Sequence, residues 1–129
     1  MFDAAFEKER ILAIVVDPMR KMIHEYHADF DDGDAEDDDF YNDDDVENVK
    51  SVLDSYVDAL AELEQPADGQ IMEQVKAVVL ALNEMNEARD YALIETDERE
   101  WLCEAIQTIA VDRGLQNVSG DITEEWREW

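Results

Sequence analysis

Carboxylates crowd one short stretch of this chain. Between Ala28 and Glu47, twelve of the twenty residues are Asp or Glu and none is Lys or Arg, so this stretch supplies −12 of the formal net charge of −26. Like charges held so close repel one another, and a bound cation or a basic protein relieves that repulsion. The chemistry indicated is the capture of positive charge. A solvated acidic loop without a partner is the alternative, because runs of like charge are often just that.

We expect a basic protein, such as a nuclease, a toxin or a nucleic-acid-binding protein, to dock on this stretch. Its aromatic side chains offer an anchor while the carboxylates steer the partner in; the alternative is that they pin the loop onto the rest of the fold. A helix rises ~1.5 Å per residue and duplex DNA carries a charge every ~1.7 Å, so loose mimicry of phosphates is also conceivable. The expected binding residues are Asp31, Asp32, Asp34, Glu36, Asp37, Asp38, Asp39, Phe40, Tyr41, Asp43, Asp44 and Asp45.

The same stretch does not fit the calcium-binding loop of an EF-hand. Read from Asp29, the loop has Phe40 at its twelfth place, where a bidentate Glu is required. Read from Asp32, it has Asp37 where the turn needs glycine. We therefore expect weak divalent-cation binding here and no dedicated calcium site.

Two histidines and an aspartate could ligate a transition metal. His24 and His27 lie three residues apart, which puts them on one helical face, and Asp31 follows. Their sequence, His-Glu-Tyr-His, is one residue short of the His-Glu-x-x-His protease motif, so protease chemistry does not carry over. We expect exposed histidines whose acidic neighbours favour the protonated form, with no metal and no cofactor.

No pattern in the chain indicates covalent catalysis. The single cysteine, Cys103, has no histidine near it in sequence, and packing is its expected role. A glycine-rich phosphate loop and a nucleophile elbow are both missing from the sequence. Exposed carboxylates lack the shelter that shifts the pKa of a catalytic acid. We expect a binding protein that is not an enzyme.

The charge balance also excludes some ligands. With 36 acidic against 10 basic side chains, binding to nucleic acid or to an anionic membrane is disfavoured. The longest apolar runs are far shorter than the ~20 residues of a membrane-spanning helix. A lone cysteine and a start without cationic and long apolar segments suit a cytoplasmic protein.

Most of the chain has the apolar spacing of helices, in which apolar side chains recur every three or four residues. Three such stripes run from Val46 to Leu63, from Ile71 to Met85 and from Leu102 to Ile109, with a break at residues 65–69 between the first two. The short break predicts an antiparallel helical hairpin. Thr96 or Asp97 is expected to cap the third helix, and Arg113 with Gly114 is expected to end it.

The two ends of the chain carry weaker signals. At the N-terminal end, apolar positions 2, 6, 11, 12 and 15 predict a helix that ends near Val16, followed by a second helix from Pro18 to about His27. A single helix kinked at Pro18 is the alternative. At the other end, Asp121 and Glu124 form a capping-box pattern ahead of an apolar face. We expect Trp126 and Trp129 on that face to dock on the bundle, or else to make a homo-oligomeric contact.

Together these patterns predict one all-α domain over residues 1–129: a bundle of four to five main helices, a long acidic loop over 28–42, and a short C-terminal helix within 115–129. In composition and class the chain is similar to small, acidic, helical bacterial proteins such as immunity proteins that block basic toxins and nucleic-acid mimics. No motif carries that similarity, so it assigns no residue a role. Two alternatives to a basic partner stay open. One is acidity as an adaptation to high salt, which the low number of four lysines suits; the other is divalent-metal binding.

Overall fold

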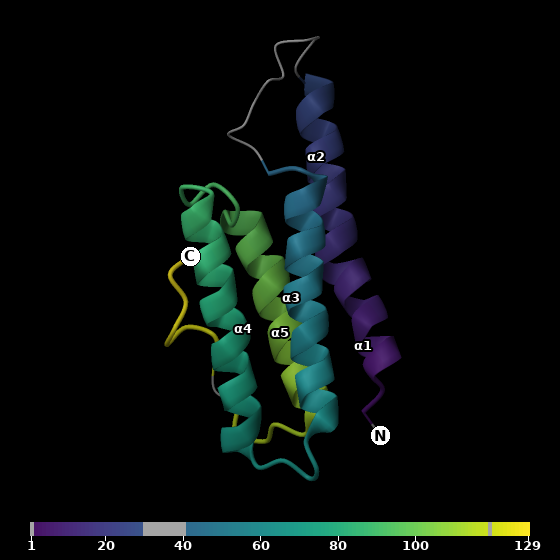
Figure 1. Ribbon diagram of the computed structural model, residues 1–129, viewed down its shortest axis with the longest axis vertical. Coiled ribbons are helices and arrows are strands. Elements are labelled where there is room, and N and C mark those ends of the chain that lie inside the picture. Colours follow the sequence, from purple (N-terminus) through teal and green to yellow (C-terminus); the bar gives the residue numbers. More distant parts are fainter. Residues whose placement is uncertain (1, 30–40, 119) are drawn as a thin grey trace.

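A computed structural model describes residues 2–29, 41–118 and 120–129, with the side chains of 26–29 excepted. Its described part is all-helical and contains no strand. The elements, in chain order, are α1 (Ala4–Ile11), η1 (Leu12–Val16), α2 (Asp17–Asp29), α3 (Asp43–Glu62), α4 (Asp68–Ala88) and α5 (Thr96–Arg113). Successive long helices run up and down, with α3 between the N-terminal helix and α4, and α5 packed against η1 and α4 (Figure 1). The predicted all-α bundle is confirmed.

The N-terminal helices form one unbroken rod. The predicted end near Val16 is wrong, and the alternative of a single helix distorted beside Pro18 is the one observed. The distortion is the π-helical turn η1, in which the backbone N–H of Asp17 bonds to the carbonyl of Leu12, five residues back. Proline has no N–H and its ring crowds the carbonyl four residues earlier. The wider π turn accommodates the ring without ending the helix.

The buried face of this rod differs from the expected one. Phe6 is 49% exposed, whereas Glu7 is fully buried. The buried stripe thus runs Glu7, Ile11, Val15, then Met19 and Ile23, at regular intervals of four residues. A charged residue therefore occupies the core position that the sequence pattern had assigned to Phe6.

The hairpin helices begin and end close to the predicted positions. The buried stripe of α3 is the one expected up to Leu60, and that of α4 is the one expected up to Leu82. Beyond these, Leu63 and Met85 are only partly buried, and Asn83 and Asn86 of α4 are buried instead. The break lies between Leu63 and Ala67. Helix α5 ends at Gly114, whose φ of 118° is the left-handed conformation that glycine adopts readily. The predicted capping by Thr96 or Asp97 is wrong. The cap position is Glu95, whose backbone N–H donates to Glu98 Oε1 at 3.1 Å.

The C-terminal segment docks on the bundle by turns and not by the short helix expected. Its residues 122–126 form consecutive turns, with Ile122 buried and both Trp126 and Trp129 packed against the core. Asn83 of α4 donates to the carbonyl of Trp126 at 2.8 Å. The predicted docking of the two tryptophans is confirmed. Among the described helices, none combines the length and the apolar character needed to cross a membrane.

Candidate functional site

Three helix ends meet at one end of the bundle, which we call the acidic end. The start of α3, the end of α4 and the start of α5 lie there, and α2 runs past them (Figure 1). Two of these are helix N-termini, where carboxylates are favoured by the helix dipole. Asp43, Asp44 and Asp45 stand in the first turn of α3, and Asp97 and Glu98 in the first turn of α5. The fold thus gathers acidic residues from two distant parts of the sequence.

Tyr41 enters the core at the acidic end. Its side chain is 2% exposed, and its hydroxyl donates to Oε2 of Glu98, 3.0 Å away, with the carbonyl of Met19 at 3.5 Å. Burial, and then the negative charge of Glu98, raise the pKa of this tyrosine, so it stays protonated as a donor. Tyr41 pins the chain onto the bundle, and its predicted role as an anchor for a partner does not fit this position.

The three carboxylates at the start of α3 have different surroundings. Asp43 and Asp44 are exposed. Asp45 is only partly exposed, accepts a hydrogen bond from the backbone N–H of Asn42 at 2.9 Å, and lies 3.3 Å from Nε of Arg89. Asp45 therefore serves the helix start, and of these three carboxylates Asp43 and Asp44 are the two that face solvent.

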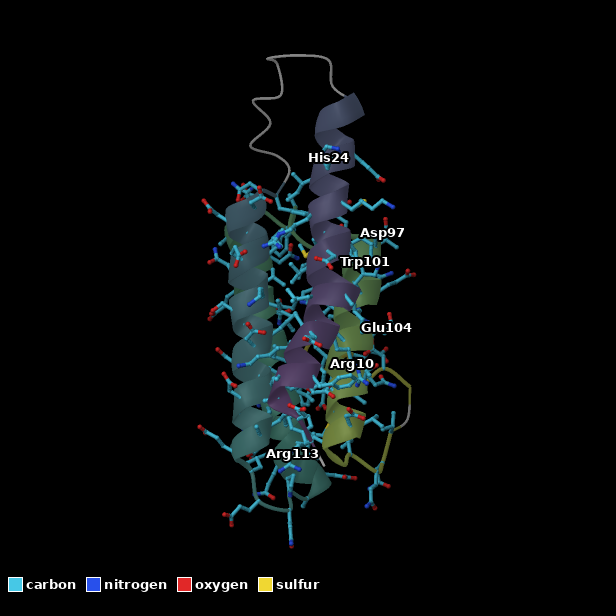
Figure 2. The ribbon with its side chains drawn as sticks, turned by 90° about the vertical axis from the view of Figure 1, so that its right-hand side faces the viewer. Arg10, His24, Asp97, Trp101, Glu104 and Arg113 are labelled. Atoms are coloured by element: carbon cyan, nitrogen blue, oxygen red, sulfur yellow. The ribbon has the colours of Figure 1, made fainter. Side chains whose placement is uncertain are left out.

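The remaining predicted binding residues lie outside the described residues: Asp31, Asp32, Asp34, Glu36, Asp37, Asp38, Asp39 and Phe40. Of the predicted metal ligands, His24 is exposed on α2 (Figure 2), while the side chain of His27 and Asp31 are not described. The described part of the chain holds no group of three His, Cys, Asp or Glu side chains suited to a metal.

A buried carboxyl group at the other end of the bundle was not anticipated. Arg10 Nη1 lies 3.3 Å from both carboxylate oxygens of Glu7 and 3.1 Å from Asp112 Oδ2. Burial raises the pKa of Glu7 from 4.5 to about 7, and the hydrogen bond with Asp112 and the negative charge of Asp112 add to this rise. The positive charge of Arg10 opposes it. The signal available in the sequence was the four-residue spacing from Glu7 to Ile11 and Val15. Because Glu7 is fully buried, we assign it a structural role.

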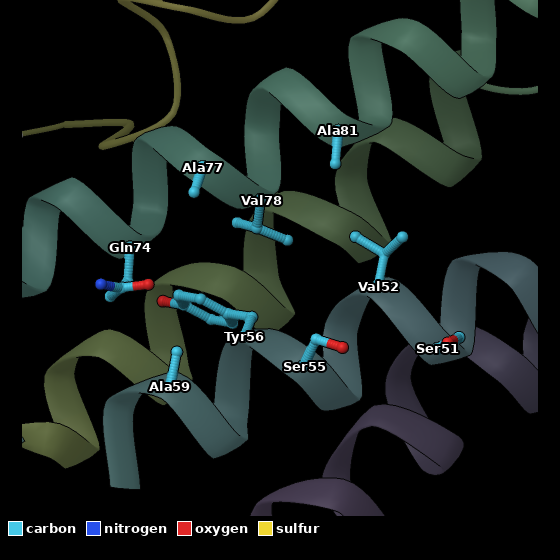
Figure 3. A pocket seen from close by; sticks show the side chains of 9 residues that line it. All are labelled: Ser51, Val52, Ser55, Tyr56, Ala59, Gln74, Ala77, Val78 and Ala81. Carbon is cyan, nitrogen blue, oxygen red and sulfur yellow. The ribbon is translucent and has the colours of Figure 1, made fainter. Parts of the chain in front are cut away.

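A groove of about 370 Å³ runs between α3 and α4, and small uncharged side chains line most of it (Figure 3). Its titratable group is Tyr56, whose hydroxyl donates to the carbonyl of Ile106 at 2.9 Å. Burial raises the pKa of this tyrosine, so it does not act as an acid near neutral pH. The groove offers neither an acid–base pair nor a nucleophile.

A second groove, of about 460 Å³, lies between α5 and the rod formed by η1 and α2. Apolar side chains from Ala13, Pro18, Met22 and Trp101 line it together with charged side chains of α2. Figure 2 shows Asp97, Trp101 and Glu104 in succession along α5. We call this the Trp101 groove.

Cys103 fits its expected packing role. Its thiol lies 3.4 Å from Oγ1 of Thr123 and 3.8 Å from Oδ2 of Asp121, both in the C-terminal segment. Burial raises the pKa of the thiol, which keeps it in the unreactive protonated form.

Comparisons with protein-family models, with curated proteins and with solved structures gave no match. What the protein does must therefore be argued from its charge and geometry.

Proposed function

We propose that this is a non-catalytic binding protein that neutralises or regulates a basic partner, such as a nuclease, a toxin or a nucleic-acid-binding protein, through the acidic segment 28–47. Carboxylate density of this kind steers cationic partners and accelerates their association. Such a role needs no metal, cofactor or catalytic group.

One observation carries the proposal: where the described part of the acidic segment joins the bundle, Tyr41 is turned inward and the carboxylates of Asp43 and Asp44 are turned outward. Tyr41 is locked in the core, whereas Asp43 and Asp44, two and three residues later, are exposed. The core is a single apolar cluster to which every described helix contributes buried side chains. The bundle thus supports the acidic segment without using the charges of Asp43 and Asp44 for its own packing.

The test compares two variants of equal net charge. The first neutralises nine acids of the segment to Asn or Gln and leaves the capping residue Asp45 intact: Asp31, Asp32, Asp34, Glu36, Asp37, Asp38, Asp39, Asp43 and Asp44. The second neutralises nine acids elsewhere: Glu9, Glu62, Glu64, Glu73, Glu84, Glu87, Glu124, Glu125 and Glu128. Each variant, and the native protein, is used to capture proteins from a lysate of the source organism at low and high salt.

We expect the native protein and the second variant to retain a basic protein at low salt, and the first variant to lose it. Capture should weaken steeply as salt rises. Equal loss in both variants would mean that net charge, and not the segment, is responsible. Equal capture by all three proteins would contradict the proposal. If the native protein captures nothing, unfolds at low ionic strength and is stabilised by salt, the acidity is an adaptation to salt.

A further inference from the structure

We propose that the Trp101 groove is an arginine-binding subsite: a guanidinium group of the basic partner stacks on Trp101 while carboxylates at the rim pair with its charge. This inference rests on the proposed function, because it takes the partner to be a basic protein. It adds a defined side chain and a defined position to that binding.

The lining of the groove suits the two halves of an arginine side chain. Ala13, Pro18, Met22 and Trp101 offer apolar surface, against which the methylene stem can lie while its charged head remains near the rim. Trp101 packs on the core and also lines the groove. Tryptophan is the side chain on which a cation is most strongly attracted to the ring face.

The charge around the groove is negative. Asp17 and Glu25 line it against a single Lys21, and Asp97 and Glu104 stand exposed on α5, four residues before and three after Trp101. That spacing puts them on the same side of the helix as Trp101. Lys21 does not fill the site: its side chain is 76% exposed and its Nζ is 4.0 Å from Glu25 Oε1, a loose pair.

The protein already stacks arginines on aromatic rings. The guanidinium carbons of Arg10, Arg113 and Arg127 lie 4.7, 5.5 and 5.4 Å from the ring centres of Phe6, Phe2 and Trp129, respectively. No cation of the described residues stacks in this way on Trp101. A guanidinium can stack and pair with carboxylates at once because it is planar, which an ammonium group cannot do.

The groove also points towards the acidic end. Met22 lines both the Trp101 groove and a smaller hollow of about 200 Å³ bordered by Tyr41 and Glu98. Tyr41 lies two residues before Asp43, so the groove is connected through Met22 to the hollow beside which the acidic segment enters α3.

The experiment uses acetyl-hexaarginine-amide as the probe and follows the indole N–H resonances of the three tryptophans by NMR, with Trp101→Phe assigning the resonance of Trp101. On the native protein we expect the Trp101 resonance to shift saturably with added peptide, while those of Trp126 and Trp129 stay in place. Hexalysine, of equal charge, should shift it much less.

Trp101→Leu should weaken hexaarginine binding about 3- to 10-fold. Lys21→Gln, which removes the opposing charge, should tighten it.

Tyr91→Leu is the matched control, because Tyr91 is a 58% exposed aromatic that does not line the groove, and it should bind as the native protein does. Saturable binding that leaves the Trp101 resonance unmoved, or an equal shift with hexalysine, would overturn the arginine subsite while leaving the acidic segment as a docking site. A Trp101 shift that survives neutralisation of the segment's nine acids would support a subsite that binds independently of the segment, whose own role is decided by the capture experiment. If Trp101→Leu does not fold, the shift of the Trp101 resonance in the native protein still tests the arginine subsite.

Discussion

Tyr41 and Glu98 are 57 residues apart in sequence and joined by a hydrogen bond of 3.0 Å inside the protein. Both side chains are 2% exposed. Glu98 also accepts the backbone N–H of Glu95, so one buried carboxylate ties the start of α5 to Tyr41, two residues before α3. The bond fixes the position of the chain where it enters α3.

Removing the hydroxyl of Tyr41 should destabilise the protein. In Tyr41→Phe, the buried carboxylate of Glu98 loses a donor and gains no solvent, which costs about 1–3 kcal/mol. Urea unfolding should show a lower midpoint with an unchanged slope. Tyr91→Phe is the control, because its hydroxyl is on an exposed side chain and its loss should change stability by less than about 0.5 kcal/mol. Equal stability of Tyr41→Phe and the native protein would show that the bond contributes nothing.

The buried carboxyl group of Glu7 should make stability depend on pH near neutrality. Its pKa is raised from 4.5 to about 7 in the folded protein, so the folded state holds this proton more tightly than the unfolded state does. The free energy of unfolding should therefore fall by about 1–3 kcal/mol as pH rises from about 4.5 to 7. Above pH 7 it should level off. The charged or titratable groups that face Glu7 are Asp3, Arg10, Asp112 and Tyr56.

Glu7→Gln tests this directly, because glutamine keeps the shape of the protonated acid and does not titrate. The difference in unfolding free energy between the variant and the native protein should grow in favour of the variant from pH 5 to pH 8. A constant difference over that range would contradict the prediction. Glu9→Gln, on the exposed side of α1, should show no such trend.

The hairpin of α3 and α4 could be predicted because each helix has an uninterrupted stripe at the helical period. In α3 the buried residues are Val46, Val49, Leu53, Tyr56, Val57 and Leu60, with polar residues on the other face. The break between the helices lies where proline and glycine stand close together. Here local propensity and tertiary burial agree.

The N-terminal rod could not be predicted in detail, for a physical reason. The run of apolar residues from Ile11 to Val16 has no polar position to set its phase, so it does not distinguish an α from a π turn. Because Glu7 is a charged residue type, the sequence pattern did not predict that it belongs to the buried stripe. The burial of Glu7 depends on Arg10 beside it and on Asp112, which is distant in sequence.

The candidate site was predicted only in its composition. The acidic residues were evident, but the sequence could not tell which aromatic side chain packs inward, because the partner of Tyr41 lies on α5. The Trp101 groove was missed because it forms from η1, α2 and α5 together. Such sites depend on tertiary packing and leave no periodic signal.

Two glycines should respond in opposite ways to alanine. Gly114 has a φ of 118°, a conformation that side chains disfavour, so Gly114→Ala should cost about 1 kcal/mol. Gly69 lies in the first turn of α4, and an added Cβ there meets no atom within 4 Å. Gly69→Ala should therefore stabilise the protein by a few tenths up to about 1 kcal/mol. Thermal unfolding of both variants checks the pair, and shifts of the same sign would contradict it.

Asn83 should hold the C-terminal segment on the bundle. Its side-chain amide donates to the carbonyl of Trp126 at 2.8 Å and its oxygen accepts the N–H of Glu128 at 3.1 Å. Asn83→Ala removes both bonds, which should cost about 1–3 kcal/mol and loosen the segment. Tryptophan emission should shift to longer wavelength and carboxypeptidase should trim the end faster, whereas the exposed control Asn48→Ala should change neither. Unchanged trimming in Asn83→Ala would mean that apolar packing of Trp126 and Trp129 holds the segment without this amide.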